Sequence, residues 1–210
     1  MNDYGLEIEK CHVAWVGGHA AIPDTDTFDG SHRFLFIALD FERKGGLLCV
    51  DAIQEVRKQF PQVELVCIGQ KPPDKVLDLL GISYAGLLRK TVSSEYETFC
   101  QHLATARGLI HPTSMDTMGM VLIESGYYGC PSIATRRFGI PELVKHEQSG
   151  LLLDVPVRPE QLVSFIGQFC EDGPIYKSMR QTARKHTTSK LTWDSFGERV
   201  MDVLRLVVDR

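Results

Sequence analysis

The chain has 210 residues, of which 43% are hydrophobic and 24% are charged, as expected for a globular domain large enough to bury a core. A net charge of −4 argues against a nucleic-acid-binding protein, and no apolar run reaches the ~18 residues of a membrane span. The N-terminus has no long apolar core of a secretory signal, and six dispersed cysteines without a Cys-x-x-Cys predict reduced thiols in a cytoplasmic protein.

The N-terminal region predicts one strand and a long loop. Residues 1–18 are interpreted as an N-terminal segment that ends in a first strand at Cys11–Val16. A polar loop follows over residues 19–32 and contains Asp24-Thr25-Asp26. An Asp-x-Asp at the end of a strand can hold a metal, but this one lies among turn-forming residues and follows Pro23. We therefore expect a solvated loop and no metal site.

The next predicted unit joins a buried strand to a helix through a basic turn that contains glycine. Residues 33–38 are strongly apolar, and a helical stripe of apolar residues runs over 46–59. Between them lie Arg43, Lys44 and Gly45. Glycine lets the backbone approach a ligand closely, and a helix start with nearby cations suits an anion such as phosphate. The alternative is a basic helix cap that faces solvent.

Strands and helices alternate along the rest of the chain. This alternation predicts an α/β protein with a doubly wound parallel sheet, a Rossmann-like fold. The predicted strands cover residues 63–68, 82–85, 109–111 and 131–134, and the predicted helices end near 80, 105, 171, 185 and 207, with one more beginning near 120.

The stretch from Leu109 to Glu124 is the most informative part of the chain. A short strand stops at Pro112, a polar loop carries Asp116, and Gly119 precedes a helix that carries Glu124. In a doubly wound sheet such a loop lies at the carboxyl end of the strands, where ligands bind. The helix start offers unpaired N–H groups to an anion, and both carboxylates can face the same crevice. The alternative is an ordinary strand, loop and helix with solvated acids.

The spacing of Asp116 and Glu124, two acids separated by seven residues, resembles the Glu-x7-Glu signature of retaining glycosyltransferases with the GT-B fold. The context is similar to family 4 of these enzymes, the glycosyl transferases group 1. Asp116, Met118 and Ser125 depart from the Glu, Phe and Ala of that family. The residues that fall in the family's register are Pro112, Thr113, Ser114, Asp116, Met118, Gly119, Glu124, Ser125, Gly129 and Pro131.

Two further segments carry the resemblance, which covers about residues 3–205. The turn at Lys44 resembles the family's phosphate loop, although Leu39 stands where a second cation is usual. Residues 138–144 resemble the family's Gly-Gly-Ile-Pro-Glu-x-Val, with Phe138 in place of the first Gly. The resemblance implies that residues 1–210 are a single domain, the C-terminal, donor-binding half of a GT-B enzyme, ending in a helix over 192–210. It also implies that the N-terminal acceptor domain is absent.

The resemblance implies a role for each matched residue. Asp116 and Lys44 are the expected catalytic residues, with Asp116 on the sugar, Lys44 on the leaving diphosphate and Glu124 on the ribose. No metal and no cofactor are expected, because the donor is itself a nucleotide-diphosphate sugar such as a UDP-, GDP- or ADP-sugar. The expected donor-binding residues are Arg43, Lys44, Gly45, Asp116, Thr117, Met118, Gly119, Met120, Val121 and Glu124, and Leu87, Leu88 and Arg89 are expected to line the base pocket.

Several forms of this function remain open from the sequence. The chain is expected to transfer a sugar with retention when it meets a separate acceptor-domain subunit, through which peripheral membrane contact is also conceivable. The alternatives are a non-catalytic module that binds nucleotide sugars and a fragment of a longer transferase. In each case the partner is a nucleotide sugar and not a nucleic acid.

Overall fold

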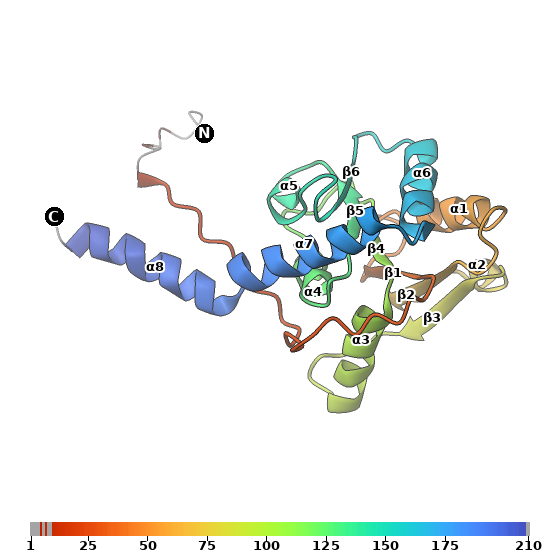
Figure 1. The fold of residues 1–210 in the computed structure, drawn as a ribbon, viewed down its shortest axis with the longest axis horizontal. Helices are drawn as coiled ribbons and strands as arrows, with labels where there is room; N and C mark the ends of the chain where they lie inside the picture. Colours follow the sequence, from red (N-terminus) through yellow and green to blue (C-terminus); the bar gives the residue numbers. More distant parts are fainter. Residues whose placement is uncertain (1–4, 6, 8–9, 209–210) are drawn as a thin grey trace.

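The computed structural model describes residues 5, 7 and 10–208. Its centre is a sheet of six parallel strands in the order β3-β2-β1-β4-β5-β6 (Figure 1). This is the doubly wound α/β fold that the sequence predicts. The strands are β1 (Arg33–Ala38), β2 (Glu64–Gly69), β3 (Ile82–Gly86), β4 (Gly108–His111), β5 (Ser132–Thr135) and β6 (Gly150–Leu153).

Helices cover both faces of the sheet. Successive side chains of each buried strand point to opposite faces, so apolar side chains on both faces need helices packed against them. Phe34 and Phe36 of β1 pack in one core with α1 and α6, whereas Leu35 of β1 packs in a second core with α3, α4 and α5. The helices are α1 (Gly46–Val56), α2 (Asp74–Leu77), α3 (Ser93–Thr105), α4 (Met120–Tyr127), α5 (Ile140–Leu143), α6 (Pro159–Cys170), α7 (Pro174–Lys190) and α8 (Trp193–Val208).

The strand order creates a crevice between β1 and β4, which are neighbours in the sheet. From β1 the chain continues to the β2 side of the sheet, and from β4 it continues to the β5 side. The helices that follow also lie on opposite faces, since α1 belongs to one core and α4 to the other. The loops after β1 and β4 therefore separate at the carboxyl ends of these strands, where doubly wound proteins bind ligands.

One sequence prediction about strands is wrong, and one strand was not predicted. The predicted strand at Cys11–Val16 is not formed, and the edges of the sheet are β3 and β6 instead. This segment runs beside α8, where the Arg199 guanidinium donates to the Trp15 carbonyl and lies 4.8 Å from the Trp15 ring. Conversely, β6 was not predicted as a strand, although it is buried and pairs with β5 along its whole length. Residues 1–4, 6, 8–9 and 209–210 of the two predicted terminal segments lie outside the described residues.

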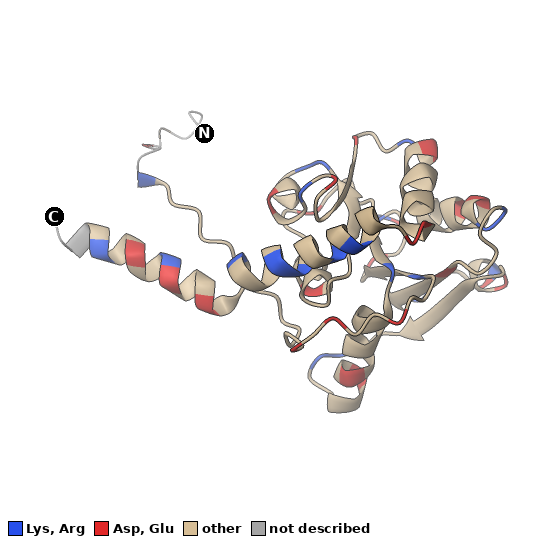
Figure 2. Ribbon diagram, in the orientation of Figure 1, with Lys and Arg blue, Asp and Glu red and all other residues tan. Residues whose placement is uncertain are grey.

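The loop over residues 19–32 is held against α7, whose charged residues are all basic (Figure 2). Arg180 is buried and lies 2.6 Å from Asp26, the second acid of the Asp-x-Asp. Its guanidinium also donates to the carbonyls of Ala106 and Tyr128. Asp26 therefore anchors the loop through an ion pair, which differs from the solvated carboxylate expected from the sequence.

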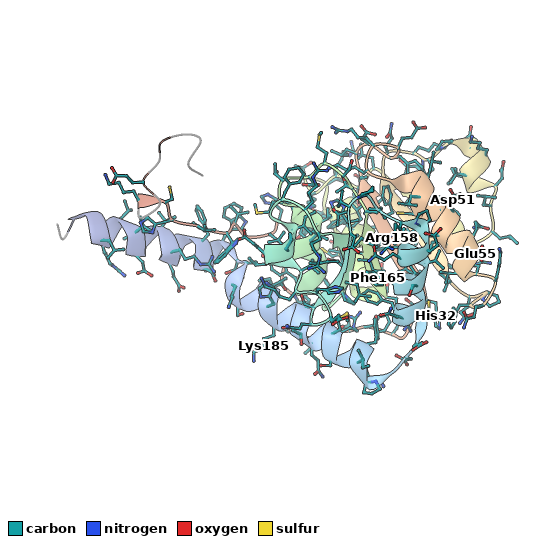
Figure 3. All side chains as sticks on the ribbon, turned by 90° about the horizontal axis from the view of Figure 1, so that it is seen from above. His32, Asp51, Glu55, Arg158, Phe165 and Lys185 are labelled. Atoms are coloured by element: carbon teal, nitrogen blue, oxygen red, sulfur yellow. The ribbon has the colours of Figure 1, made fainter. Side chains whose placement is uncertain are left out.

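Helix α8 and the described residues before Gly18 extend together away from the body of the domain, as the views in Figures 1 and 3 both show. The described part of α8 exposes the apolar side chains of Met201, Leu204 and Leu206. Among the described residues, no helix has the length and apolar composition that crossing a membrane requires.

Candidate functional site

An open pocket with a volume of about 600 Å³ lies at the carboxyl ends of β1, β2 and β4. It occupies the crevice between the loops that follow β1 and β4, and the loop after β3 closes one end. Its wall combines apolar side chains with charged ones. The lining residues are Ile37, Ala38, Leu39, Asp40, Arg43, Lys44, Ile68, Gly69, Leu87, Leu88, Lys90, Phe99, His111, Asp116, Gly119, Met120 and Val121.

The loop after β1 brings two cations to the pocket. Gly45, the N-cap of α1, has a φ of 89°, a left-handed conformation that favours glycine. A Cβ at this position would lie 3.0 Å from Cγ of Pro112, so the glycine also permits a close approach of the two loops. Arg43 pairs with Asp40 at 2.9 Å, and the Lys44 ammonium crosses to the other loop.

Asp116 occupies the centre of the loop after β4 and uses both carboxylate oxygens. Oδ1 accepts the backbone N–H groups of Gly119, at 2.9 Å, and Met118, at 3.3 Å. Oδ2 lies 2.8 Å from Nζ of Lys44 and 3.1 Å from Nε2 of His111. The carboxylate thus folds its own loop and joins that loop to Lys44.

These contacts hold the pKa of Asp116 well below its usual range. The main cause is the hydrogen bond from His111, and the hydrogen bond and charge of Lys44 act in the same direction, while partial burial opposes them. Asp116 is therefore a carboxylate at neutral pH. Its chemistry is to accept hydrogen bonds, from hydroxyl groups among other donors, and it is not suited to donate a proton.

The start of α4 adds backbone donors to the pocket. Gly119 has a φ of 72°, which turns the chain into the helix, and no acidic residue lies in the first turn. The amides of Met118 and Gly119 are taken by Asp116, whereas those of Met120 and Val121 have no acceptor within the part of the chain that the structure describes. Of the predicted amide donors, Met120 and Val121 are thus the pair left to bind an anion.

Glu124 lies one turn further into α4 and is completely buried. Its Oε1 accepts the backbone N–H of His19 at 2.9 Å and pairs with the Lys90 ammonium. The sequence predicts that Glu124 faces the crevice, but its side chain does not line the pocket, whose wall here is formed by Lys90. Lys90 was not among the predicted site residues. The one sequence signal for it is its position directly after Leu87, Leu88 and Arg89.

The predicted base pocket is only partly assembled. Leu87 and Leu88 line the pocket, whereas Arg89 turns away and pairs with Glu95 at the start of α3.

Thr117 is exposed, and its carbonyl accepts the N–H of Gly139. His111, which sequence reasoning missed, is buried beside Asp116 and lines the pocket. Its position at the end of β4 was the one available signal.

Each cation of the pocket wall has a carboxylate partner. The pairs are Arg43 with Asp40, Lys44 with Asp116, and Lys90 with Glu124. A bound anion therefore has to compete with these carboxylates or share their cations. In the part of the chain described here, no group of three or more His, Cys, Asp or Glu side chains could hold a metal ion.

The strand order and the pocket at its switch point are those of a doubly wound α/β domain of the GT-B type, and solved structures agree. The GtfA/B complex superposes with a TM-score of 0.74 and 16% identity over 92% of this chain and 39% of that chain. Anabaena HepE, solved in complex with UDP-glucose, gives a TM-score of 0.67 and 16% identity over 83% and 49%. At this identity the likeness concerns the fold alone.

The chain belongs to the glycosyl transferases group 1, whose family model matches residues 21–186. Its fold corresponds to that of the C-terminal domain of GT-B glycosyltransferases. One relative, the D-inositol 3-phosphate glycosyltransferase of Jonesia denitrificans, is 29% identical over 216 aligned positions, which cover 91% of this chain and 50% of the relative. The chain thus spans half of that relative's length.

Proposed function

We propose that this domain binds a nucleotide-diphosphate sugar for a retaining, family 4 type glycosyltransferase. One observation carries the proposal. Lys44, from the loop after β1, and Asp116, from the loop after β4, meet at 2.8 Å in the pocket at the switch point of the sheet. A cation for a diphosphate and an acceptor for sugar hydroxyls are thereby placed side by side. HepE, which shares the fold, was solved with such a donor.

The pocket suits the charge changes of sugar transfer. When the bond between sugar and diphosphate breaks, negative charge grows on the leaving diphosphate. Lys44 and the free amides of Met120 and Val121 would stabilise that charge, with Arg43 at the rim. Asp116 would accept hydrogen bonds from the sugar hydroxyls and help to orient the ring. No metal is needed for these roles, and none of them requires a cofactor.

Leu39 favours weak binding of the diphosphate. It lines the pocket and is 79% exposed, at the position where the family usually has a cation. The pocket therefore lacks one positive charge, and its remaining cations are already paired. This observation supports the alternative that the domain binds nucleotide sugars without efficient transfer.

We propose that the acceptor is bound by a separate domain or subunit. The exposed apolar side chains of Met201, Leu204 and Leu206 on α8 are consistent with a further protein surface there. The chain also covers only 39% of its counterpart in GtfA/B, which is itself a complex. The 210-residue chain alone should therefore transfer sugar very poorly, and fast turnover by the purified chain would contradict this part of the proposal.

Titration calorimetry with UDP, GDP, ADP and their common sugar conjugates tests the function. At least one nucleoside diphosphate should bind, and EDTA should leave its affinity unchanged. Lys44→Met should weaken it about tenfold, the expected effect of losing one charged hydrogen bond. Lys58→Met is the matched control, because Lys58 is exposed and pairs with Glu55 of α1. Binding that disappears with EDTA would contradict the metal-free site, and no binding at all would contradict the function.

A further inference from the structure

His111 is a buried polar side chain at the end of β4, where this strand meets the pocket. The sheet fixes its backbone, since His111 pairs with Ala134 of β5, and its side chain is only 4% exposed. The ring nevertheless lines the pocket, beside the backbone of Gly119. A Cβ at Gly119 would lie 3.4 Å from Nε2 of His111, so the glycine leaves room for the ring. His111 is thus firmly held and still part of the site.

The His111 ring makes one hydrogen bond within the part of the chain that the structure describes. Nε2 lies 3.1 Å from Oδ2 of Asp116, while the buried Nδ1 has no partner there. An ionised carboxylate only accepts hydrogen bonds, so the proton of the ring belongs on Nε2. This bond joins the end of the strand to the middle of the loop that follows it.

Oδ2 of Asp116 has a second partner, the Lys44 ammonium, and the two partners are held differently. Lys44 belongs to the loop after β1, is 18% exposed and also donates to the Met115 carbonyl. In the proposed function Lys44 contacts a diphosphate, so its bond to Asp116 is the one that a ligand exchanges. His111 is buried in the sheet and stays in place. It is then the side chain that still holds Oδ2.

We propose that His111 is a positioning residue, which keeps the Asp116 carboxylate directed at the donor sugar when Lys44 turns to the diphosphate. This inference rests on the proposed function. The loop amides hold Oδ1 and His111 holds one side of Oδ2, so the acceptor position that Lys44 vacates is the one open to a sugar hydroxyl. Without His111 the carboxylate is free to rotate, and the sugar meets a less ordered acceptor.

Nuclear magnetic resonance of the ligand-free protein tests the bond itself. Proton–nitrogen correlation spectra of the unmodified protein should show a proton on Nε2 of His111, identified by the loss of this signal in His111→Gln. A ring without a proton on Nε2 cannot donate to Asp116 and would overturn the inference.

The titration of the Asp116 carboxyl group tests the same bond from the other side. Among the described residues, the titratable groups that lower the pKa of this carboxyl are His111, from β4, and Lys44, from the loop after β1. His111→Leu removes a donor to the charged form, so the carboxyl should take up its proton about one pH unit higher than in the unmodified protein. Carbon resonances of the side-chain carboxyl group, assigned with Asp116→Asn, measure this shift. An unchanged titration would show that His111 does not act on Asp116.

Titration calorimetry tests the effect on the sugar. The probes are UDP, GDP and ADP together with UDP-glucose, GDP-mannose and ADP-glucose. His111→Leu should weaken the tightest nucleotide sugar about fivefold and leave its bare nucleoside diphosphate within about twofold. His111→Gln, whose amide can replace the Nε2 donor, should restore most of the affinity. The matched control is His102→Leu, because His102 lies on α3 and is not part of the pocket wall. It should bind as the unmodified protein does.

A double variant separates positioning from a purely structural role. If His111 acts through Asp116, His111→Leu should cause no further loss of nucleotide-sugar affinity in the Asp116→Asn background. A further loss there, or an equal loss for the bare nucleotide, would overturn the inference. If His111→Leu does not fold, His111→Asn takes its place, since it keeps a polar group but is too short to replace Nε2.

The two proposals fail in different ways. If nucleotide sugars bind and His111→Leu leaves their affinity unchanged, the positioning role is wrong and the function stands. If the unmodified protein binds none of the probes, both are wrong.

Discussion

The Lys44 ammonium and the Asp116 carboxylate lie 2.8 Å apart and join the loops that follow β1 and β4. Both side chains are mostly shielded from solvent, at 18% and 20% exposure. Both residues line the pocket, so the pair forms part of its wall. In the proposed function, a diphosphate at Lys44 would replace Asp116 as its counter-ion and so free that carboxylate for the sugar.

Asp116→Asn should distinguish a bare nucleotide from a nucleotide sugar. The amide keeps the shape of the side chain but lacks the charge that competes for Lys44, so the nucleoside diphosphate should bind equally well or better. The nucleotide sugar should lose about fivefold to tenfold in affinity, because its hydroxyls lose a charged acceptor. Calorimetry with both ligands measures the difference. An equal loss for the two would show that Asp116 does not act on the sugar ring.

The low pKa of Asp116 predicts a specific dependence of stability on pH. Because the pKa is lower in the folded state than the ~3.9 of an unfolded Asp, the stabilisation is fully present above that value and is lost as the pH falls below it. The free energy of unfolding of the unmodified protein should thus approach that of Asp116→Asn between about pH 4 and pH 2.

Urea denaturation at a series of pH values checks this expectation. Asp51→Asn is the control, since Asp51 is exposed on α1 (Figure 3). Its difference from the unmodified protein should stay small throughout. A gap between Asp116→Asn and the unmodified protein that does not shrink on acidification would contradict the stabilisation of the carboxylate by His111 and Lys44.

Gly45→Ala should damage the site more than a matched glycine substitution. Gly45 and Gly30 have similar φ values, 89° and 83°, but a Cβ at Gly30 meets no atom within 4 Å. Gly30→Ala should cost about 1 kcal/mol for the left-handed backbone alone. Gly45→Ala should cost about 2–3 kcal/mol, because the Cβ also presses on Pro112. Denaturation and nucleotide titration together should show that only Gly45→Ala weakens binding, and equal effects would deny the close approach.

Asp26→Asn tests whether the Asp-x-Asp is structural. Removing its charge leaves the buried Arg180 without its carboxylate counter-ion, at an expected cost of about 2 kcal/mol in the free energy of unfolding. Asp24→Asn should be nearly neutral, because Asp24 is exposed. Thermal denaturation with and without Mg²⁺ or Mn²⁺ measures both effects. A metal-dependent shift that Asp26→Asn removes would indicate a metal site instead.

The sequence by itself determined the class of fold and the region of the site. Apolar runs such as 33–38 and the turn residues between them mark strands and loops locally, so the alternation that builds a parallel sheet is legible without the structure. The spacing of Asp116, Gly119 and Glu124 is likewise local, and it located the loop and helix start that line the pocket.

Only the tertiary structure decided which groups meet. Residues 11–16 have an apolar pattern typical of a strand, but Arg199 of α8 takes up the Trp15 carbonyl instead. Lys90 and Glu124 come from different loops and elements, so no local pattern relates them. Burial at a helix position and the choice of a counter-ion depend on contacts between distant segments. For that physical reason the sequence marks Asp116 and Glu124 only as candidates, and the fold decides that Asp116 pairs with Lys44 and Glu124 with Lys90.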